Sequence, residues 1–138
     1  MAAKLIDTNV LVRFLVETPA TVPEKFRGVF TFFPKVERGD LTVELPELVL
    51  FQAFFVLTSH YKVPTAQAAA TLSELVRFRG IVMTDKTLIL DCLHTLVRQH
   101  TDLVDAYLLA LAKKRHVGEV YSFDRDLAKA GLTVLEVN

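Results

Sequence analysis

The sequence has very little cysteine and no excess charge of either sign, and each shortage excludes a class of protein. A single cysteine, Cys92, in 138 residues cannot form an internal disulfide, and it favours a reducing compartment such as the cytoplasm. The 16 Lys and Arg side chains balance the 16 Asp and Glu side chains, so the net charge provides no attraction to a polyanion. Any nucleic-acid binding must therefore use a local patch of residues.

Long apolar runs and glycine-rich loops are also missing. The stretches Leu48–Phe51 and Ala53–Leu57 are divided by Gln52 and are too short to span a bilayer, which takes about 20 residues. Because no signal peptide is recognisable either, we expect a cytoplasmic protein with no membrane segment. The five glycines form no phosphate-binding loop, which disfavours a nucleotide-binding Rossmann or P-loop protein.

Hydrophobic residues are plentiful, at 51% of the chain, and their pattern predicts an α/β fold. Short apolar or alternating segments predict strands at 5–6, 41–45, 81–83, 119–123 and 132–137. Helices are predicted at 9–17, 46–60, 65–79, 85–100, 102–116 and 125–130, with Thr8, Thr84 and Thr101 as N-caps of three of them. Because strands alternate with helices, we expect one domain over residues 1–138, with a mainly parallel central sheet of about four to five strands flanked by helices.

Two predicted elements depart from simple patterns. Thr21 is expected to cap a second helix, with Pro23 and Glu24 in its first turn, and Gly28 and Pro34 are expected to make this region irregular. The helix at 46–60 is apolar almost all round, so we expect it to be buried on several sides.

Acidic residues occur where the predicted sheet would place a ligand. Asp7 follows the first predicted strand, and Asp124 follows the fourth. Right-handed crossovers bring the C-terminal ends of parallel strands to one edge, where open α/β sheets bind ligands. Asp105 lies in the first turn of a predicted helix, where the helix dipole alone is a sufficient reason for an acid. The alternative is that all three carboxylates converge, and then a cation must neutralise them.

Three short motifs, taken in chain order, resemble those of a known family. They are Asp-Thr-Asn at 7–9, Asp-Leu-Val-Asp-Ala at 102–106 and Ser-Phe-Asp-Arg-Asp at 122–126. In this order they resemble the PIN-domain family, and specifically the VapC-type toxin ribonucleases of type II toxin–antitoxin systems. The resemblance extends from Lys4 to about Val137 and includes the order of the predicted elements.

The resemblance implies a metal-dependent ribonuclease. Asp7, Asp105 and Asp124 would be the carboxylates that hold Mg²⁺ or Mn²⁺, and water activated by the metal would hydrolyse RNA phosphodiester bonds. The polar and basic residues near these acids would position the substrate. These residues are Thr8, Asn9, Arg13, Ser122 and Arg125. For Arg125 the alternative is a surface ion pair with Asp126 or Asp102.

One position departs from the family pattern. Such proteins usually carry a glutamate in the helix after the second strand, and the matching residue here is Gln52. Gln52 is the only polar residue from Leu48 to Leu57, so we expect it to be buried against a polar partner, either the carboxylates or a helix or subunit contact. An amide binds a hard cation more weakly than a carboxylate does.

The substitution leaves two functions open. The first is an active ribonuclease in which Gln52 stands among the catalytic residues at reduced rate. The second is a PIN-like module that binds RNA or an antitoxin, with weak or lost catalysis.

The segment around the predicted helix at 46–60 contains more aromatic residues than could all face one narrow apolar side of a helix. Phe51, Phe54, Phe55 and Tyr61 crowd one segment, which indicates either a well-filled core or a homodimer face with a groove for a peptide. By resemblance, we expect a homodimer and a cognate antitoxin whose C-terminal segment lies across the groove.

Overall fold

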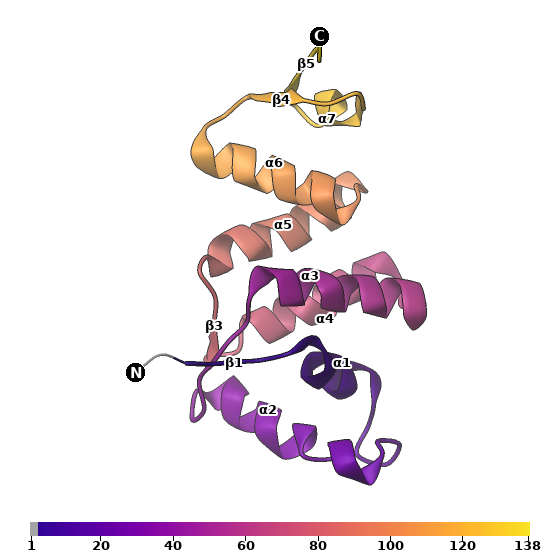
Figure 1. The fold of residues 1–138 in the computed structure, drawn as a ribbon, viewed down its shortest axis with the longest axis vertical. Coiled ribbons are helices and arrows are strands. Elements are labelled where there is room, and N and C mark those ends of the chain that lie inside the picture. Colours follow the sequence, from indigo (N-terminus) through magenta and orange to yellow (C-terminus); the bar gives the residue numbers. More distant parts are fainter. Residues whose placement is uncertain (1–2) are drawn as a thin grey trace. The chain divides into compact units, whose positions relative to one another are not determined.

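The structure is a computed structural model that describes residues 3–138. The chain divides into two compact units, Met1–Lys86 and Thr87–Asn138. Every pair of neighbouring strands in the described residues is parallel, and helices alternate with strands (Figure 1). The expected mixed α/β fold with parallel strands is therefore confirmed. That residues 1–138 form one domain stays a prediction.

The helices and strands of both units are short. In the described part of the first unit they are β1 (Lys4–Leu5), α1 (Thr8–Val16), the 3₁₀ helix η1 (Glu24–Phe26), α2 (Val29–Arg38), β2 (Val43–Glu44), α3 (Glu47–Phe55), the π-helix η2 (Val56–His60), α4 (Thr65–Val76) and β3 (Ile81–Val82). The second unit contains α5 (Lys86–Gln99, beginning one residue before the boundary), α6 (Leu103–Arg115), β4 (Glu119–Tyr121), α7 (Asp126–Lys129) and β5 (Thr133–Leu135). No helix in residues 3–138 is long and apolar enough to cross a membrane.

The described strands form two sheets. In the first unit β2 lies between β1 and β3, with Val43 opposite both Lys4 and Ile81. The Ile6 amide extends this pairing by donating to the Glu44 carbonyl at 3.1 Å, so Asp7 follows directly at the C-terminal edge. In the second unit β4 pairs with β5. The expected number of strands is present, but they are divided between a three-stranded and a two-stranded sheet.

Aromatic stacking holds α1 against α2. The Phe14 ring stacks on Phe33 with centroids 4.3 Å apart and lies 5.9 Å from Phe30. The chain is irregular up to Gly28, as expected, but α2 continues through Pro34, so the expected interruption at Pro34 is wrong. Proline removes one backbone hydrogen bond from a helix. Burial of Phe33, which is fully enclosed, offsets that loss because an aromatic side chain contributes a large apolar area.

A close backbone contact at Gly80 joins α2 to the start of β3. The Gly80 amide donates to the Val36 carbonyl at 2.8 Å. A Cβ atom at this position would lie 2.7 Å from that same carbonyl oxygen and would collide with the Leu41 carbonyl oxygen. Only glycine fits here without a backbone shift.

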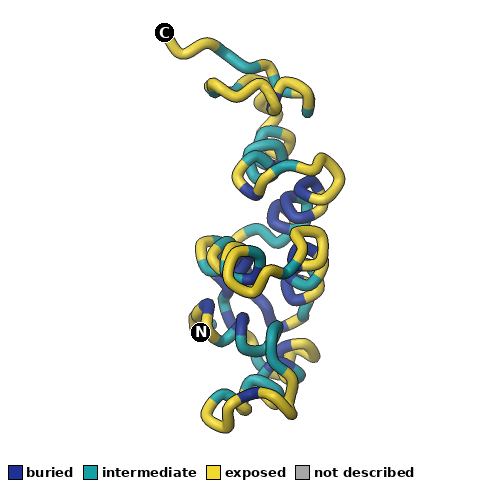
Figure 2. The backbone as a smooth tube through the Cα atoms, turned by 90° about the vertical axis from the view of Figure 1, so that its right-hand side faces the viewer, coloured by how far each residue is buried: buried dark blue, intermediate teal, exposed yellow. Residues whose placement is uncertain are grey.

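Burial is uneven along the chain. Dark blue, buried backbone is frequent in the first unit and in α5, whereas β4, α7 and β5 are mostly yellow or teal (Figure 2). From Glu119 to Asn138, only Leu127 is buried. The exposed apolar side chains of this segment include Tyr121, at 71% exposure, and Phe123, at 87%.

Candidate active site

Asp7 lies at the C-terminal end of β1 and caps α1. Its carboxylate accepts a hydrogen bond from the Thr8 amide at 2.7 Å, and its backbone is extended, as an N-cap requires. The N-cap is therefore Asp7, and the assignment of Thr8 to that position is wrong. An extended Asp7 can stop β1 and begin α1 at once, which places its exposed carboxylate at the edge of the sheet.

Thr8 links α1 to α3 through Gln52. The Thr8 side chain is buried, and its hydroxyl donates to the Gln52 side-chain carbonyl at 2.6 Å. Gln52 itself is exposed, so the expectation of a buried amide is wrong. The cause is the outward face that Gln52 shares with Leu48 and Phe55, which are 79% and 48% exposed. The apolar helix α3 is buried along one side only.

In the second unit, Asp105 and Asp124 line one cleft of about 360 Å³. The Asp102 carboxylate caps α6 by accepting from the Asp105 amide at 2.8 Å, so Asp102 is the cap in place of Thr101. Burial raises the pKa of the Asp105 carboxyl, and the negative charges of Asp102, Asp124 and Asp126 raise it further. The cleft therefore places three further carboxylates around Asp105, which resists ionisation.

The loop that carries Asp124 is held by side-chain hydrogen bonds to its backbone. The Ser122 hydroxyl accepts from the Asp124 amide at 2.9 Å, and the Asp124 carboxylate accepts from the Asp126 amide at 2.9 Å. These bonds turn the chain from β4 into α7 and hold Asp124 in the loop that lines the cleft. Asp126 lies 3.8 Å from the Lys129 ammonium, an exposed pair that contributes little to stability.

Two members of the acidic cleft, Asp102 and Asp126, were not assigned to the site from the sequence. The spacing of three residues between Asp102 and Asp105 was a signal for Asp102. The spacing of two residues between Asp124 and Asp126 gave no such signal, because residues two apart do not share a helical face.

The proposed substrate-positioning residues have different surroundings. In the first unit, Asn9 and Arg13 line a mainly apolar cleft of about 820 Å³, and the Arg13 guanidinium lies over the Phe26 ring at 4.0 Å from its centroid. Lys4 and Lys25 line the same cleft. In the second unit, Arg125 is exposed and makes no ion pair within residues 3–138, so its side chain is available to an external anion.

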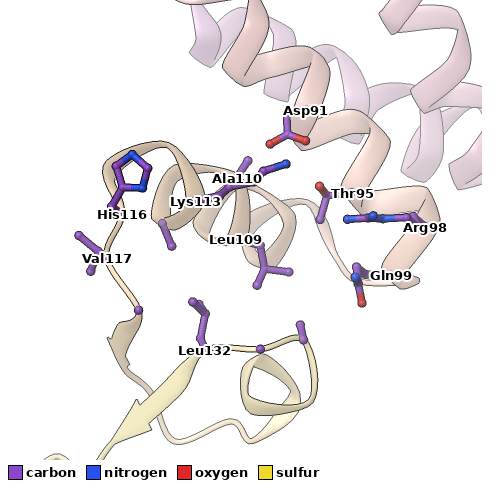
Figure 3. A pocket seen from close by; sticks show the side chains of 14 residues that line it. Asp91, Thr95, Arg98, Gln99, Leu109, Ala110, Lys113, His116, Val117 and Leu132 are labelled. Atoms are coloured by element: carbon purple, nitrogen blue, oxygen red, sulfur yellow. The ribbon is translucent and has the colours of Figure 1, made fainter.

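A second cleft of the second unit, about 430 Å³, has a different character. Figure 3 shows Arg98 and Thr95 from α5 and Leu109 from α6 around it, with Leu132 on the opposite side. Its cationic side chains, with Lys113 among them, outnumber its single carboxylate, Asp91. Neither Asp105 nor Asp124 lines this cleft, although it adjoins the acidic one, because Gln99 and Ala130 line both.

Carboxylates are suitable donors for a hard divalent cation, which prefers oxygen ligands. A cation bound beside Asp105 would stabilise its charged form and so oppose the rise in pKa that burial and the neighbouring acids cause. Within residues 3–138, no three His, Cys, Asp or Glu side chains are grouped as ligands of one ion. Asp7 belongs to the first unit and Asp105 and Asp124 to the second, so each unit presents part of the predicted ligand set.

Comparison with known proteins identifies the family. The PIN domain model matches residues 4–132, which is almost the whole chain. No curated protein matches the sequence. The matched span includes Asp7, Gln52, Asp105 and Asp124. The chain therefore belongs to the PIN domain family, whose members are generally nucleases.

Proposed function

We propose that the protein is a metal-dependent ribonuclease that hydrolyses RNA phosphodiester bonds. The observation that carries this proposal is the cleft shared by Asp105 and Asp124, in which burial and then the neighbouring acids raise the pKa of Asp105. Acids that repel one another in a concave site are a marker of a functional rather than a purely structural arrangement.

Each residue has a defined task in the proposed reaction. Asp7, Asp105 and Asp124 would hold Mg²⁺ or Mn²⁺, which when bound supplies an activated water and stabilises charge on the scissile phosphate. Ser122 fixes the loop of Asp124 through the hydrogen bond to its amide. Arg125, exposed and unpaired within the described residues, contacts a phosphate oxygen of the RNA backbone.

RNA cleavage with added Mg²⁺ or Mn²⁺ tests this proposal directly. A labelled single-stranded RNA of mixed sequence is cleaved by the wild-type chain, cleavage stops with EDTA, and Asp124→Asn lowers the rate at least about a hundredfold. Asp40→Asn is the matched control, because Asp40 is an exposed acid paired with Arg38 at 3.0 Å in the first unit. Equal activity of wild type and Asp124→Asn would refute the proposal.

We further propose a cytoplasmic toxin that forms a homodimer and is held inactive by a cognate antitoxin. Exposed apolar side chains support a protein partner, since Leu48 on α3 and Phe123 after β4 are 79% and 87% exposed. Induced expression in a bacterial host is expected to stop growth, and Asp124→Asn is expected to abolish that effect. Light scattering of the purified chain measures whether it is a dimer.

The alternative function is a PIN-like module that binds RNA or an antitoxin and cleaves poorly. One observation favours it: an uncharged amide stands at position 52, and its carbonyl is already bound by Thr8. Comparison of wild type with Gln52→Glu separates the two functions. A large gain of cleavage in Gln52→Glu supports the binding module, whereas strong and equal cleavage by both chains excludes it.

A further inference from the structure

The hydrogen bond between Thr8 and Gln52 fixes the orientation of an exposed amide next to Asp7. A threonine hydroxyl has one proton to donate, and Thr8 gives it to the Gln52 carbonyl at 2.6 Å. That distance is at the short end of the range for hydroxyl donors. The Thr8 hydroxyl is buried with its residue, while Asp7, one residue earlier, receives the Thr8 amide. Asp7, Thr8 and Gln52 are therefore linked by two consecutive hydrogen bonds.

The engaged carbonyl leaves the other end of the amide free. The Gln52 NH₂ group has two protons to donate, and it has no acceptor among residues 3–138. Gln52 is also exposed, so an external acceptor can reach it. The arrangement thus offers two uncommitted donors at the edge of the sheet that carries Asp7.

A glutamate at position 52 would act in the opposite way. One carboxylate oxygen would accept from Thr8, and the second oxygen would be an acceptor suited to a cation. An NH₂ group cannot ligate a cation, but it donates well to phosphate oxygens, as glutamine side chains do at nucleic-acid interfaces.

We propose that Gln52 is a positioning residue for the RNA backbone, oriented by Thr8 so that its NH₂ group donates to a phosphate oxygen beside Asp7. This inference rests on the proposed function for the identity of the ligand. It gives Gln52 a role in substrate binding and not the role of a weakened metal ligand.

RNA affinity measured without divalent ions separates these roles. Fluorescence anisotropy with a labelled single-stranded RNA of mixed sequence, in EDTA, is applied to wild type, Gln52→Met and Gln52→Glu. Loss of one hydrogen bond in Gln52→Met is expected to weaken binding about tenfold. Gln52→Glu is expected to weaken it more, because a carboxylate repels phosphate. Gln67→Met is the matched control, an exposed glutamine on α4.

The Thr8 variants test the orientation. Thr8→Val removes the hydroxyl at similar shape and is expected to weaken RNA binding severalfold, whereas Thr8→Ser retains the donor and binds like wild type. Thermal unfolding of each variant confirms that the fold is intact. In Mg²⁺, Gln52→Met is expected to raise KM while kcat changes less than about twofold, as for loss of a uniform binding contact.

The outcomes distinguish this inference from the proposed function. If Gln52→Met binds RNA as tightly as wild type, or if Gln52→Glu keeps its RNA affinity and gains metal affinity, the inference is overturned. If wild type cleaves RNA and Gln52→Met is unaffected, the nuclease remains and the positioning role falls. If wild type binds RNA through Gln52 but never cleaves it, the positioning role stands and the nuclease falls.

Discussion

Asp7 and Asp105 are acids at the starts of helices, but the two units surround them differently. The cleft beside Asp7 is lined by the cations Lys4, Arg13 and Lys25 and by apolar side chains. The cleft beside Asp105 is lined by three further acids and a single lysine. In the first unit, the neighbouring cations can balance the negative charge of Asp7. In the second unit, the neighbouring acids add to the negative charge of Asp105. The demand for an added cation therefore arises mainly in the second unit.

The largest expected effect tests whether the rate of RNA cleavage depends on which acid of the cleft is replaced. Asp105→Asn is expected to lower RNA cleavage at least about a hundredfold, because it removes a carboxylate from the proposed metal site. Asp126→Asn removes the same charge from the same cleft, yet it is expected to reduce cleavage less than about tenfold. Initial rates at saturating Mg²⁺ provide the measurement. Equal losses in both variants would mean that total charge, not ligand position, governs the reaction.

The next effect compares the packing of the two units. Gly80→Ala in the first unit is expected to lower the free energy of unfolding by about 1–3 kcal/mol, because the added methyl group meets two backbone carbonyls. Gly118→Ala, between α6 and β4, has open space around the new Cβ and is expected to stay within about 0.5 kcal/mol of wild type. Urea unfolding measures both. A large loss at Gly118 would show tighter packing there than the geometry indicates.

A smaller effect concerns the cap of α6. Asp102→Ala removes the acceptor for the Asp105 amide, and a lost cap of this kind costs about 1 kcal/mol. Relief of repulsion with Asp105 offsets part of that loss. Asp102→Ser retains an acceptor and removes the charge, so its unfolding free energy is expected to equal or exceed that of wild type. A clear loss in Asp102→Ser would contradict the repulsion inferred for the cleft.

The smallest effect is a pH dependence in the second unit. The pKa of Asp105 is raised in the fold, so the folded chain holds its proton at pH values where the unfolded chain has released it. The free energy of unfolding should therefore fall as pH rises from the ordinary carboxyl range through the raised pKa. Asp105→Asn is expected to gain stability relative to wild type over that range in urea titrations. A relative loss would reverse the sign and refute the raised pKa.

Glycine and proline residues and the alternation of apolar segments predicted many of the helix ends and the parallel pairing of the strands. Gly39, which has a positive φ of 85°, ends α2, and Pro64 immediately precedes α4, whose start at Thr65 agrees with the helix predicted at 65–79. The parallel pairing followed from the alternation of strands and helices. Pro34 was misleading, because a proline weakens a helix locally while the stacking of Phe33 on Phe14 depends on residues distant in sequence.

The candidate site was predictable in its members but not in its contacts. The edge position of Asp7 and the early-helix position of Asp105 follow from spacing alone. The exposure of Gln52 does not, because an all-apolar helix gives no indication of which side is covered. Nor could spacing show that Thr8, 44 residues earlier, donates to it.

The Thr8 hydroxyl has a consequence for how this protein can evolve. It needs only an oxygen acceptor on α3, and both an amide and a carboxylate supply one of the same shape. Glutamine and glutamate codons differ at a single base, so one mutation exchanges them while the link between α1 and α3 is retained. Selection can therefore change the chemistry at position 52 in either direction without first repairing the fold.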